Sequence, residues 1–263
     1  MLVFSGVANA SAALALDSDR FILADDERKF LCVFSLNNPA MEPQRLQIKD
    51  IIGKRIRKEP DLEGAARIGQ DIYWIASHGT DDEGKRSRAR NMLFATRLKQ
   101  TENGLQIKLK GGIYRDLLAD LRRDPAYWGV LGFPRAPKIP PKTPGGISIE
   151  GLAASPKGRL LIGFRNPLCE DRAVIARIRN PGALIKGGKP DFMPPLLIDL
   201  GRRGIRSIES MPGGYLIVGG AIDEEIASRL FFWTGKQRDV PVELAYQLPD
   251  DFNPEAVFLL PEK

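Results

Sequence analysis

The stretch that decides the fold is EGLAASPKGRLLIGFR, residues 150–165. It joins two apolar runs through a Ser-Pro-Lys-Gly turn, which is the pattern of a β-hairpin. The same pattern returns as EGAARIGQDIYWIASH from residue 63, SAALALDSDRFILADD from residue 11 and IESMPGGYLIVGGA from residue 208. A shorter copy, EAVFLLPEK, begins at residue 255. An internal repeat of this kind determines the architecture before single-residue propensities are weighed.

Two further apolar runs follow most of the hairpins. The third runs cover residues 30–36, 92–98, 173–178 and 229–233, and the fourth runs cover residues 106–109, 196–200 and 242–246. Four antiparallel strands per repeat are typical of a propeller blade. We therefore predict an all-β fold, a single-domain β-propeller over residues 1–263 with about five to six four-stranded blades. The predicted blades begin near residues 11, 63, 150, 209 and 255.

The long interval between the second and third copies predicts an insertion over about residues 113–148. Its first part, IYRDLLADLRRDP, places Leu117, Leu118 and Leu121 on one helical face and meets a proline at Pro125. The remainder, FPRAPKIPPKTPGG, has too many prolines for regular structure. We expect a short helix and a loop that cover one end of the propeller, and a linker between two domains is the alternative.

Composition bounds the classes of partner and compartment. Lys and Arg exceed Asp and Glu by 39 − 33 = 6, and the basic run KRIRK at residues 54–58 has no interleaved aromatic residues, so we expect no nucleic-acid partner. No apolar run is long enough to span a membrane. Cys32 and Cys169 lie in different repeats, which excludes a disulfide framework and favours a reducing compartment. Residues 1–15 lack a basic signal-peptide start, so we expect a cytoplasmic protein.

The hairpins predict one rim rich in carboxylates. In a hairpin, the start of the first strand and the end of the second lie at the same edge. This offset is 15 residues from Glu63 to His78 (78 − 63) and from Glu150 to Arg165 (165 − 150). The predicted inner ring is Glu63, Glu150, Glu209 and Glu255, and the residues expected just outside it are Asp25, Asp26, His78, Arg165 and Asn166.

Neighbouring carboxylates raise one another's pKa and need a compensating positive charge. One solution is an ion-pair network with Arg165 and Arg206. The other is a hard divalent cation such as Ca²⁺, which takes carboxylate, amide and carbonyl oxygens. One histidine and two distant cysteines argue against a zinc or copper site. The residues leave both solutions open.

His78 is the only histidine, and it lies in a polar turn rather than in an apolar run. A lone loop histidine is often merely solvated. The register of His78 with the carboxylate rim makes it a candidate general base, phosphate contact or metal ligand. The loop that follows carries four cations, Lys85, Arg86, Arg88 and Arg90. Such a loop favours anionic ligands, phosphates in particular.

Several longer motifs carry a family resemblance. They are DLEGAARIG from residue 61, YWIASHG from residue 73, EGLA from residue 150, LLIGFRNPL from residue 160 and GIRSIE from residue 204. Over nearly the whole chain the sequence resembles an uncharacterised bacterial family of propeller-like proteins, known only as a domain of unknown function. This resemblance implies a fold and no established activity. The EGLA strand is more remotely similar to that of esterase-like phytase and calcium-dependent lactonase propellers. That resemblance implies Ca²⁺ held by carboxylates at the channel mouth and action on phosphoesters or lactones.

Two functions from different classes follow. In the first, a divalent cation on Glu63, Glu150, Glu209 and Glu255 serves a hydrolase of phosphoester or lactone substrates. His78 would be its general base and Arg165 would steady the anion, with Asp25, Asp26, Lys85, Asn166 and Arg206 as further ligand-binding residues. In the second, a non-catalytic scaffold binds a protein or a small anionic ligand, and Arg165 and Arg206 lock the glutamates.

The last copy of the repeat predicts an unusual closure of the ring. EAVFLLPEK supplies one strand without a hairpin partner. Residues 2–5 could complete that blade. Otherwise the strand edges would be exposed, and oligomer formation or a partner would cover them.

Overall fold

The computed structural model of the chain describes most of its length. The described residues are 3–7, 9–25, 28–53, 58–81, 83–102, 104–132, 139–222, 226–246, 248–249 and 252–261. Asp26 and residues 54–57 of the basic run lie outside this part of the chain.

The described strands form four four-stranded antiparallel sheets, each a meander in chain order. Blade 1 contains β1 (Ala10–Ala15), β2 (Arg20–Asp25), β3 (Phe30–Ser35) and β4 (Gln44–Gln47). Blade 2 contains β5 (Leu62–Ile68), β6 (Asp71–Ala76), β7 (Leu93–Thr101) and β8 (Gly104–Tyr114). Blade 3 contains β9 (Ser148–Ala154), β10 (Leu160–Cys169), β11 (Arg172–Ile178) and β12 (Phe192–Ile198). Blade 4 contains β13 (Gly204–Met211), β14 (Gly214–Gly220), β15 (Arg229–Trp233) and β16 (Val242–Glu243).

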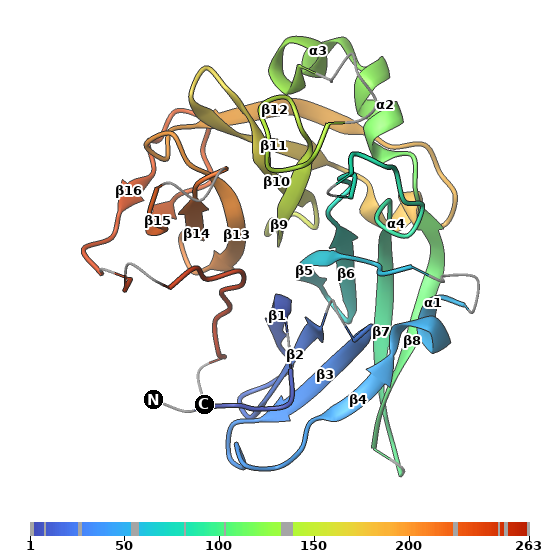
Figure 1. Cartoon of the computed structure of the whole chain (residues 1–263). Helices are drawn as coiled ribbons and strands as arrows, with labels where there is room; N and C mark the ends of the chain where they lie inside the picture. Colours follow the sequence, from blue (N-terminus) through green and yellow to red (C-terminus); the bar gives the residue numbers. More distant parts are fainter. Residues whose placement is uncertain are drawn as a thin grey trace.

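The four sheets are arranged around a common centre. Figure 1 shows the first strands β1, β5, β9 and β13 near the middle and the later strands of each sheet toward the outside. The prediction of an all-β propeller is therefore confirmed. The predicted number of five to six blades is wrong, because the described residues form four.

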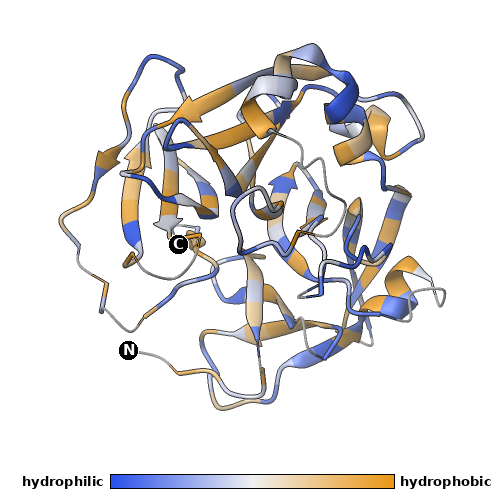
Figure 2. Cartoon of the chain, turned by 45° about the horizontal axis from the view of Figure 1, so that its top comes forward, coloured by the Kyte–Doolittle hydropathy of each residue, from blue (hydrophilic) through white to orange (hydrophobic). Residues whose placement is uncertain are grey.

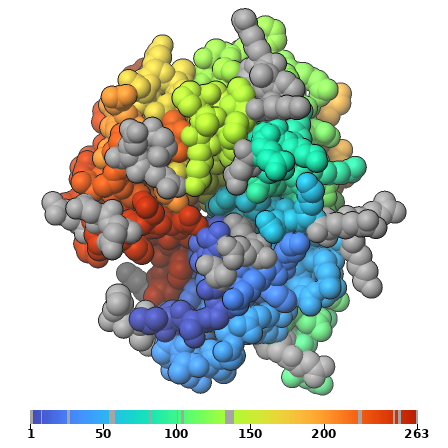
Figure 3. Space-filling view, in the orientation of Figure 1, coloured from blue at the N-terminus to red at the C-terminus, as the bar shows by residue number. Residues whose placement is uncertain are grey.

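The predicted number of blades is too high because the last copy of the repeat does not form a blade. No strand is assigned within residues 252–261, which lie between blade 4 and blade 1. The backbone N–H of Val257 donates to Ser207 Oγ on β13 at 3.1 Å, and Phe258 stacks on Phe21 of β2 with ring centroids 5.2 Å apart. Figure 3 shows the red C-terminal residues against the blue N-terminal ones. A single segment thus occupies the place where the repeat predicted a further blade.

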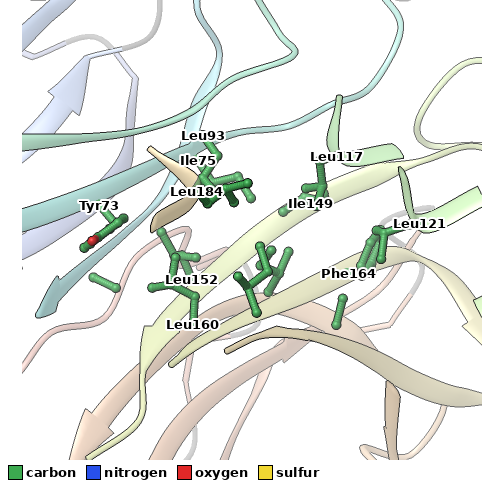
Figure 4. Packing of buried hydrophobic residues seen from close by; sticks show 14 of the residues in the cluster. Tyr73, Ile75, Leu93, Leu117, Leu121, Ile149, Leu152, Leu160, Phe164 and Leu184 are labelled. Carbon is green, nitrogen blue, oxygen red and sulfur yellow. The ribbon is translucent and has the colours of Figure 1, made fainter. Parts of the chain in front are cut away.

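The hydrophobic core lies mainly between adjacent blades. Consecutive residues are buried along strands such as β6 and β10, and successive side chains point to opposite faces, so both faces of these sheets supply packing surface. Figure 2 shows apolar residues distributed over all four sheets. Between blades 2 and 3, Tyr73, Ile75 and Leu93 gather with Leu152 and Leu160 in one buried cluster (Figure 4). Packing of this kind fixes each blade to its neighbour.

The insertion contains two helices. In α2 (Leu117–Arg123) the side chains of Leu117 and Leu121 are fully buried and join the cluster between blades 2 and 3. The second helix, α3 (Pro125–Leu131), begins at the proline where the sequence predicted an end. Proline suits the first turn of a helix, where its missing N–H costs nothing, and the Asp124 side chain caps that turn by accepting from the backbone N–H of Ala126 at 3.0 Å.

Two shorter helices complete the described structure, α1 (Ile48–Ile52) and α4 (Pro181–Leu184). Among the described residues, no helix has the length and apolar character needed to cross a membrane.

Candidate functional site

Three inner strands share the same irregularity where they pair with their second strands. The pairing register shifts between Leu62 and Gly64 in β5, between Ile149 and Gly151 in β9, and between Ile205 and Ser207 in β13. In each case one extra residue is inserted as a β-bulge, which redirects its side chain. These bulged residues are Glu63, Glu150 and Arg206.

The register therefore aligns Arg206, and not Glu209, with Glu63 and Glu150. A sequence signal for this alignment exists. Each bulged residue stands after an apolar residue and before a small one, as in Leu62-Glu63-Gly64 and Ile205-Arg206-Ser207. The sequence-based prediction placed Glu209 in the ring because it is a glutamate. The bulged residue of blade 4 is Arg206, three positions earlier.

Glu209 lies further along β13, opposite Leu216. Its carboxylate accepts hydrogen bonds from the backbone N–H groups of Leu259 and Ser210 and faces Arg67. Burial outweighs these favourable contacts and raises the pKa of Glu209 to about 7. Glu209 thus holds the segment 252–261 and takes no part in the ring at the bulges.

A buried ion-pair network surrounds Glu150. Arg165 Nη1 lies 3.0 Å from Glu150 Oε1, and Arg206 Nε lies 3.7 Å from Glu150 Oε2. Arg206 Nη2 reaches Glu255 Oε1 at 2.9 Å. The side chains of Glu150 and Arg165 are only 9% and 5% exposed. Two guanidinium groups therefore compensate two of the predicted rim carboxylates.

Arg165 also connects two blades. Its Nε donates to the carbonyl oxygen of Ala221 at 2.9 Å and its Nη2 to that of Ile222 at 3.3 Å, both just beyond β14 of blade 4. Gly204 allows this approach, because a Cβ atom there would lie 1.9 Å from the Arg165 carbonyl oxygen. The geometry assigns Arg165 a structural position between blades.

The space at the axis is very small. Ser11, Glu63, Glu150 and Ser207 border a cavity of about 10 Å³, which is room for at most a single water molecule. The described residues contain no group of three or more His, Cys, Asp or Glu side chains placed to hold a metal ion. As arranged, with Glu150 and Glu255 facing guanidinium groups, these side chains do not fit a Ca²⁺ cage. A calcium site stays a prediction.

The other predicted ligand residues are dispersed. Asp25 is buried at the end of β2 and accepts from the backbone N–H of Arg28 at 3.2 Å. Asn166 Nδ2 donates to the carbonyl oxygens of Pro141 and Thr143 at 2.7 and 2.8 Å, which holds the proline-rich loop against blade 3. Lys85 has an exposed side chain. Asp26 lies outside the described residues.

A much larger cavity, of about 1170 Å³, lies between blades 2 and 3. Its wall is built by the loop after β6, the end of β8, helix α2, part of the insertion and the segment after α4. The volume is slightly above the roughly 300–1,000 Å³ typical of small-molecule sites. We call it the interblade cavity.

Positive charge dominates the wall of the interblade cavity. Among the described residues, the wall contains six cations, Arg86, Arg88, Arg115, Arg122, Arg123 and Lys189, and two acids, Asp116 and Asp120. The difference is 6 − 2 = 4 positive charges. Asp120 is already engaged by Arg123 at 2.8 Å.

Three of the guanidinium groups in this wall have no carboxylate partner within the described part of the chain. No ion pair among the described residues involves Arg86, Arg88 or Arg115. Arg115 instead donates from Nη1 to the carbonyl oxygen of Arg88 at 2.7 Å. Burial, followed by the charge of Arg88, lowers the pKa of Arg115. An anion would relieve this repulsion.

His78 lies in the wall of the same cavity. Its backbone has φ of 55°, and its N–H donates to the carbonyl oxygen of Arg90 at 3.0 Å. The ring atom Nδ1 lies 2.8 Å from the carbonyl oxygen of Ala76. Burial, helped by the charge of Arg115, lowers the pKa of His78 to about 4. Nε2 of His78 and Oγ of Ser87 are buried without a hydrogen-bond partner among the described residues.

The sequence indicated only part of this site. It singled out His78 and the cationic loop that carries Arg86 and Arg88. Arg115, Arg122 and Lys189 were missed because they lie directly after β8, in α2 and after α4, and these segments are distant in the chain from the loop after β6. No local pattern brings such segments together. Arg90 of the same loop is bound elsewhere, to Asp61 at 3.3 Å.

The buried network makes Glu150 a sensitive position for stability. We expect Glu150→Gln to lower the free energy of unfolding by about 3–5 kcal/mol, because it removes the buried negative charge that faces the guanidinium groups of Arg165 and Arg206. Glu170→Gln, which breaks the exposed pair with Arg172, is the matched control and should cost less than about 1 kcal/mol. Urea unfolding measures both. Equal, small losses in the two variants would contradict the network.

The raised pKa of Glu209 predicts a pH dependence. Between its usual value of 4.5 and about 7, the folded chain holds a proton at Glu209 that the unfolded chain releases. Stability from this group therefore falls as the pH rises through that window. Glu209→Gln should gain on the wild type from pH 4.5 to 7 and keep a constant advantage above it. Urea unfolding at several pH values tests this, and a difference independent of pH would refute it.

Several solved structures are similar to this chain. Solved structures similar in fold include the nidogen/laminin complex (TM-score 0.47, 12% identity, 95% of this chain and 68% of that chain). They also include the PQQ-bound aldose sugar dehydrogenase of Streptomyces coelicolor (TM-score 0.45, 12% identity, 93% and 83%). A third is a sialidase of Trypanosoma rangeli (TM-score 0.44, 12% identity). The similarity covers 90% of this chain and 37% of the sialidase.

No curated protein matches the chain in sequence. A family model described as protein of unknown function, DUF3616, matches residues 99–249. The match covers 249 − 99 + 1 = 151 of the 263 residues, more than half of the chain. The resemblance to an uncharacterised propeller family is thereby confirmed. The chain belongs to the DUF3616 family.

Proposed function

We propose that the protein is a non-catalytic binding propeller whose ligand is a small anion held in the interblade cavity. One observation carries the proposal: a large cavity whose wall has four more cations than acids, with Arg86, Arg88 and Arg115 outside every ion pair of the described residues. Like charges placed together without counter-charge are costly, and a bound anion removes that cost.

The character of His78 favours binding over catalysis. An effective general base has a pKa near the working pH. The pKa of His78, lowered to about 4, makes its imidazole a weak base at neutral pH. The imidazole is therefore suited to accept a hydrogen bond and poorly suited to remove a proton.

The axial residues support the same choice. A divalent-cation-dependent hydrolase of phosphoesters or lactones would need the carboxylates of Glu150 and Glu255 for its metal. Arg165 and Arg206 would first have to give up these buried ion pairs, and breaking a buried ion pair is costly. A binding function in the interblade cavity requires no such rearrangement.

Titration calorimetry with inorganic phosphate on chelator-stripped protein tests the proposal. We expect binding without added metal, an affinity that falls with salt concentration, and a loss of about ten-fold in Arg88→Gln, since one charge-assisted hydrogen bond contributes about 1.5–3 kcal/mol. Arg202→Gln, which removes an arginine with a 74% exposed side chain in the loop before β13, is the control and should bind like the wild type.

Two results would overturn the proposal. One is the absence of binding heat at millimolar phosphate and low salt. The other is equal weakening in Arg88→Gln and Arg202→Gln, which would show that only the overall charge of the chain matters.

A further inference from the structure

The hydrogen-bonding state of His78 narrows the ligand class, an inference that rests on the proposed function. Nδ1 lies 2.8 Å from the carbonyl oxygen of Ala76. A carbonyl oxygen can only accept a hydrogen bond, so Nδ1 carries the proton. In a neutral imidazole the other nitrogen, Nε2, is then an acceptor with a free lone pair.

The imidazole is neutral at ordinary pH and held firmly. Burial lowers the pKa of His78 to about 4, with a contribution from Arg115. The backbone N–H of His78 is bound by the carbonyl oxygen of Arg90, and the neighbouring carbonyl of Ser77 accepts from the backbone N–H of Ile149 on β9. Both blades therefore fix the position of the ring.

The wall thus offers two opposite hydrogen-bonding characters. The guanidinium groups of Arg86, Arg88 and Arg115 only donate, whereas Nε2 of His78 only accepts. The hydroxyl of Ser87, also buried without a partner among the described residues, does either. An oxygen of a carboxylate, or of a fully deprotonated oxyanion such as sulfate, satisfies the arginines but not Nε2, because both atoms would present lone pairs.

The donor for Nε2 must therefore belong to another part of the ligand. An ammonium group would be repelled by the four excess positive charges of the wall. A hydroxyl group carries no charge, donates to Nε2 and also suits Ser87. We propose that the ligand combines an anionic group with hydroxyl groups, as a phosphorylated polyol does, and that one hydroxyl donates to Nε2 of His78.

Nε2 of His78 and Oγ of Ser87 are both buried in the cavity wall. Their surfaces are shielded from water, so the ligand hydroxyl displaces part of the wall to reach them. Buried polar atoms that gain a partner only on binding discriminate strongly between ligands with and without the matching group. The proposal therefore predicts selectivity as well as affinity.

Calorimetry with three probes on the full chain tests the selectivity. We expect glucose 6-phosphate to bind at least about ten-fold more tightly than sulfate, a tetrahedral anion without an O–H donor at neutral pH, and glucose to bind more weakly than either. In His78→Asn the advantage of glucose 6-phosphate should vanish while sulfate binding is retained. Asparagine tolerates the positive φ of this position, which keeps the variant folded, and is too short to replace the imidazole.

A spectroscopic readout on the wild type needs no substitution. Because the chain has one histidine, protein carrying ¹⁵N-labelled histidine gives one pair of imidazole nitrogen resonances. We expect a proton on Nδ1 and none on Nε2 at neutral pH. The Nε2 resonance should move when glucose 6-phosphate is added and stay in place with sulfate.

The outcomes separate the two proposals. Equal affinity for sulfate and glucose 6-phosphate, both weakened by Arg88→Gln, would overturn the hydroxyl requirement and leave anion binding standing. An Nε2 resonance unmoved by bound glucose 6-phosphate would also overturn it, since the ring would then be sealed in the wall. Failure of both anions to bind, or glucose binding as tightly as glucose 6-phosphate, would overturn the anion site itself.

Discussion

The guanidinium group of Arg165 is the contact on which the junction of blades 3 and 4 depends. It is buried, pairs with Glu150 at 3.0 Å within blade 3 and donates to the carbonyl oxygens of Ala221 and Ile222 beside blade 4. Removing a charge from water is costly unless its hydrogen bonds are satisfied, and this arginine has acceptors from both blades. Gly204 supplies the close backbone approach that the contact requires.

Charge is handled differently at the axis and between blades 2 and 3. At the axis, Glu150 and Glu255 are matched by Arg165 and Arg206, and the remaining space is only about 10 Å³. In the interblade cavity the cations exceed the acids and about 1170 Å³ is available. Paired charges in a closed space stabilise the fold, whereas excess positive charge around a cavity favours binding of an anion. For this reason we propose that the ligand binds between blades 2 and 3 and not at the axis.

Much of the fold could be predicted from the sequence, because hairpins are local. Strand β11 covers residues 172–178 where a run at 173–178 was expected, and β15 matches residues 229–233. The blade count failed because the last copy, which has no hairpin partner, was counted as the start of a blade, whereas residues 252–261 pack against blades 4 and 1 without an assigned strand. Arg206 was not predicted as a ring residue because the repeats were aligned on their glutamates. The bulged residues instead share a small residue, Gly or Ser, at the next position. The interblade cavity escaped prediction since its wall joins segments that are distant in the chain.

The most direct measurement is anomalous scattering from crystals of the protein soaked in selenate, a tetrahedral oxyanion like phosphate. The account predicts a selenium peak within the interblade cavity, in hydrogen-bond reach of Arg86, Arg88 or Arg115. Selenate found at the axis between Arg165 and Arg206, or only at arginines outside the cavity wall, would contradict this assignment.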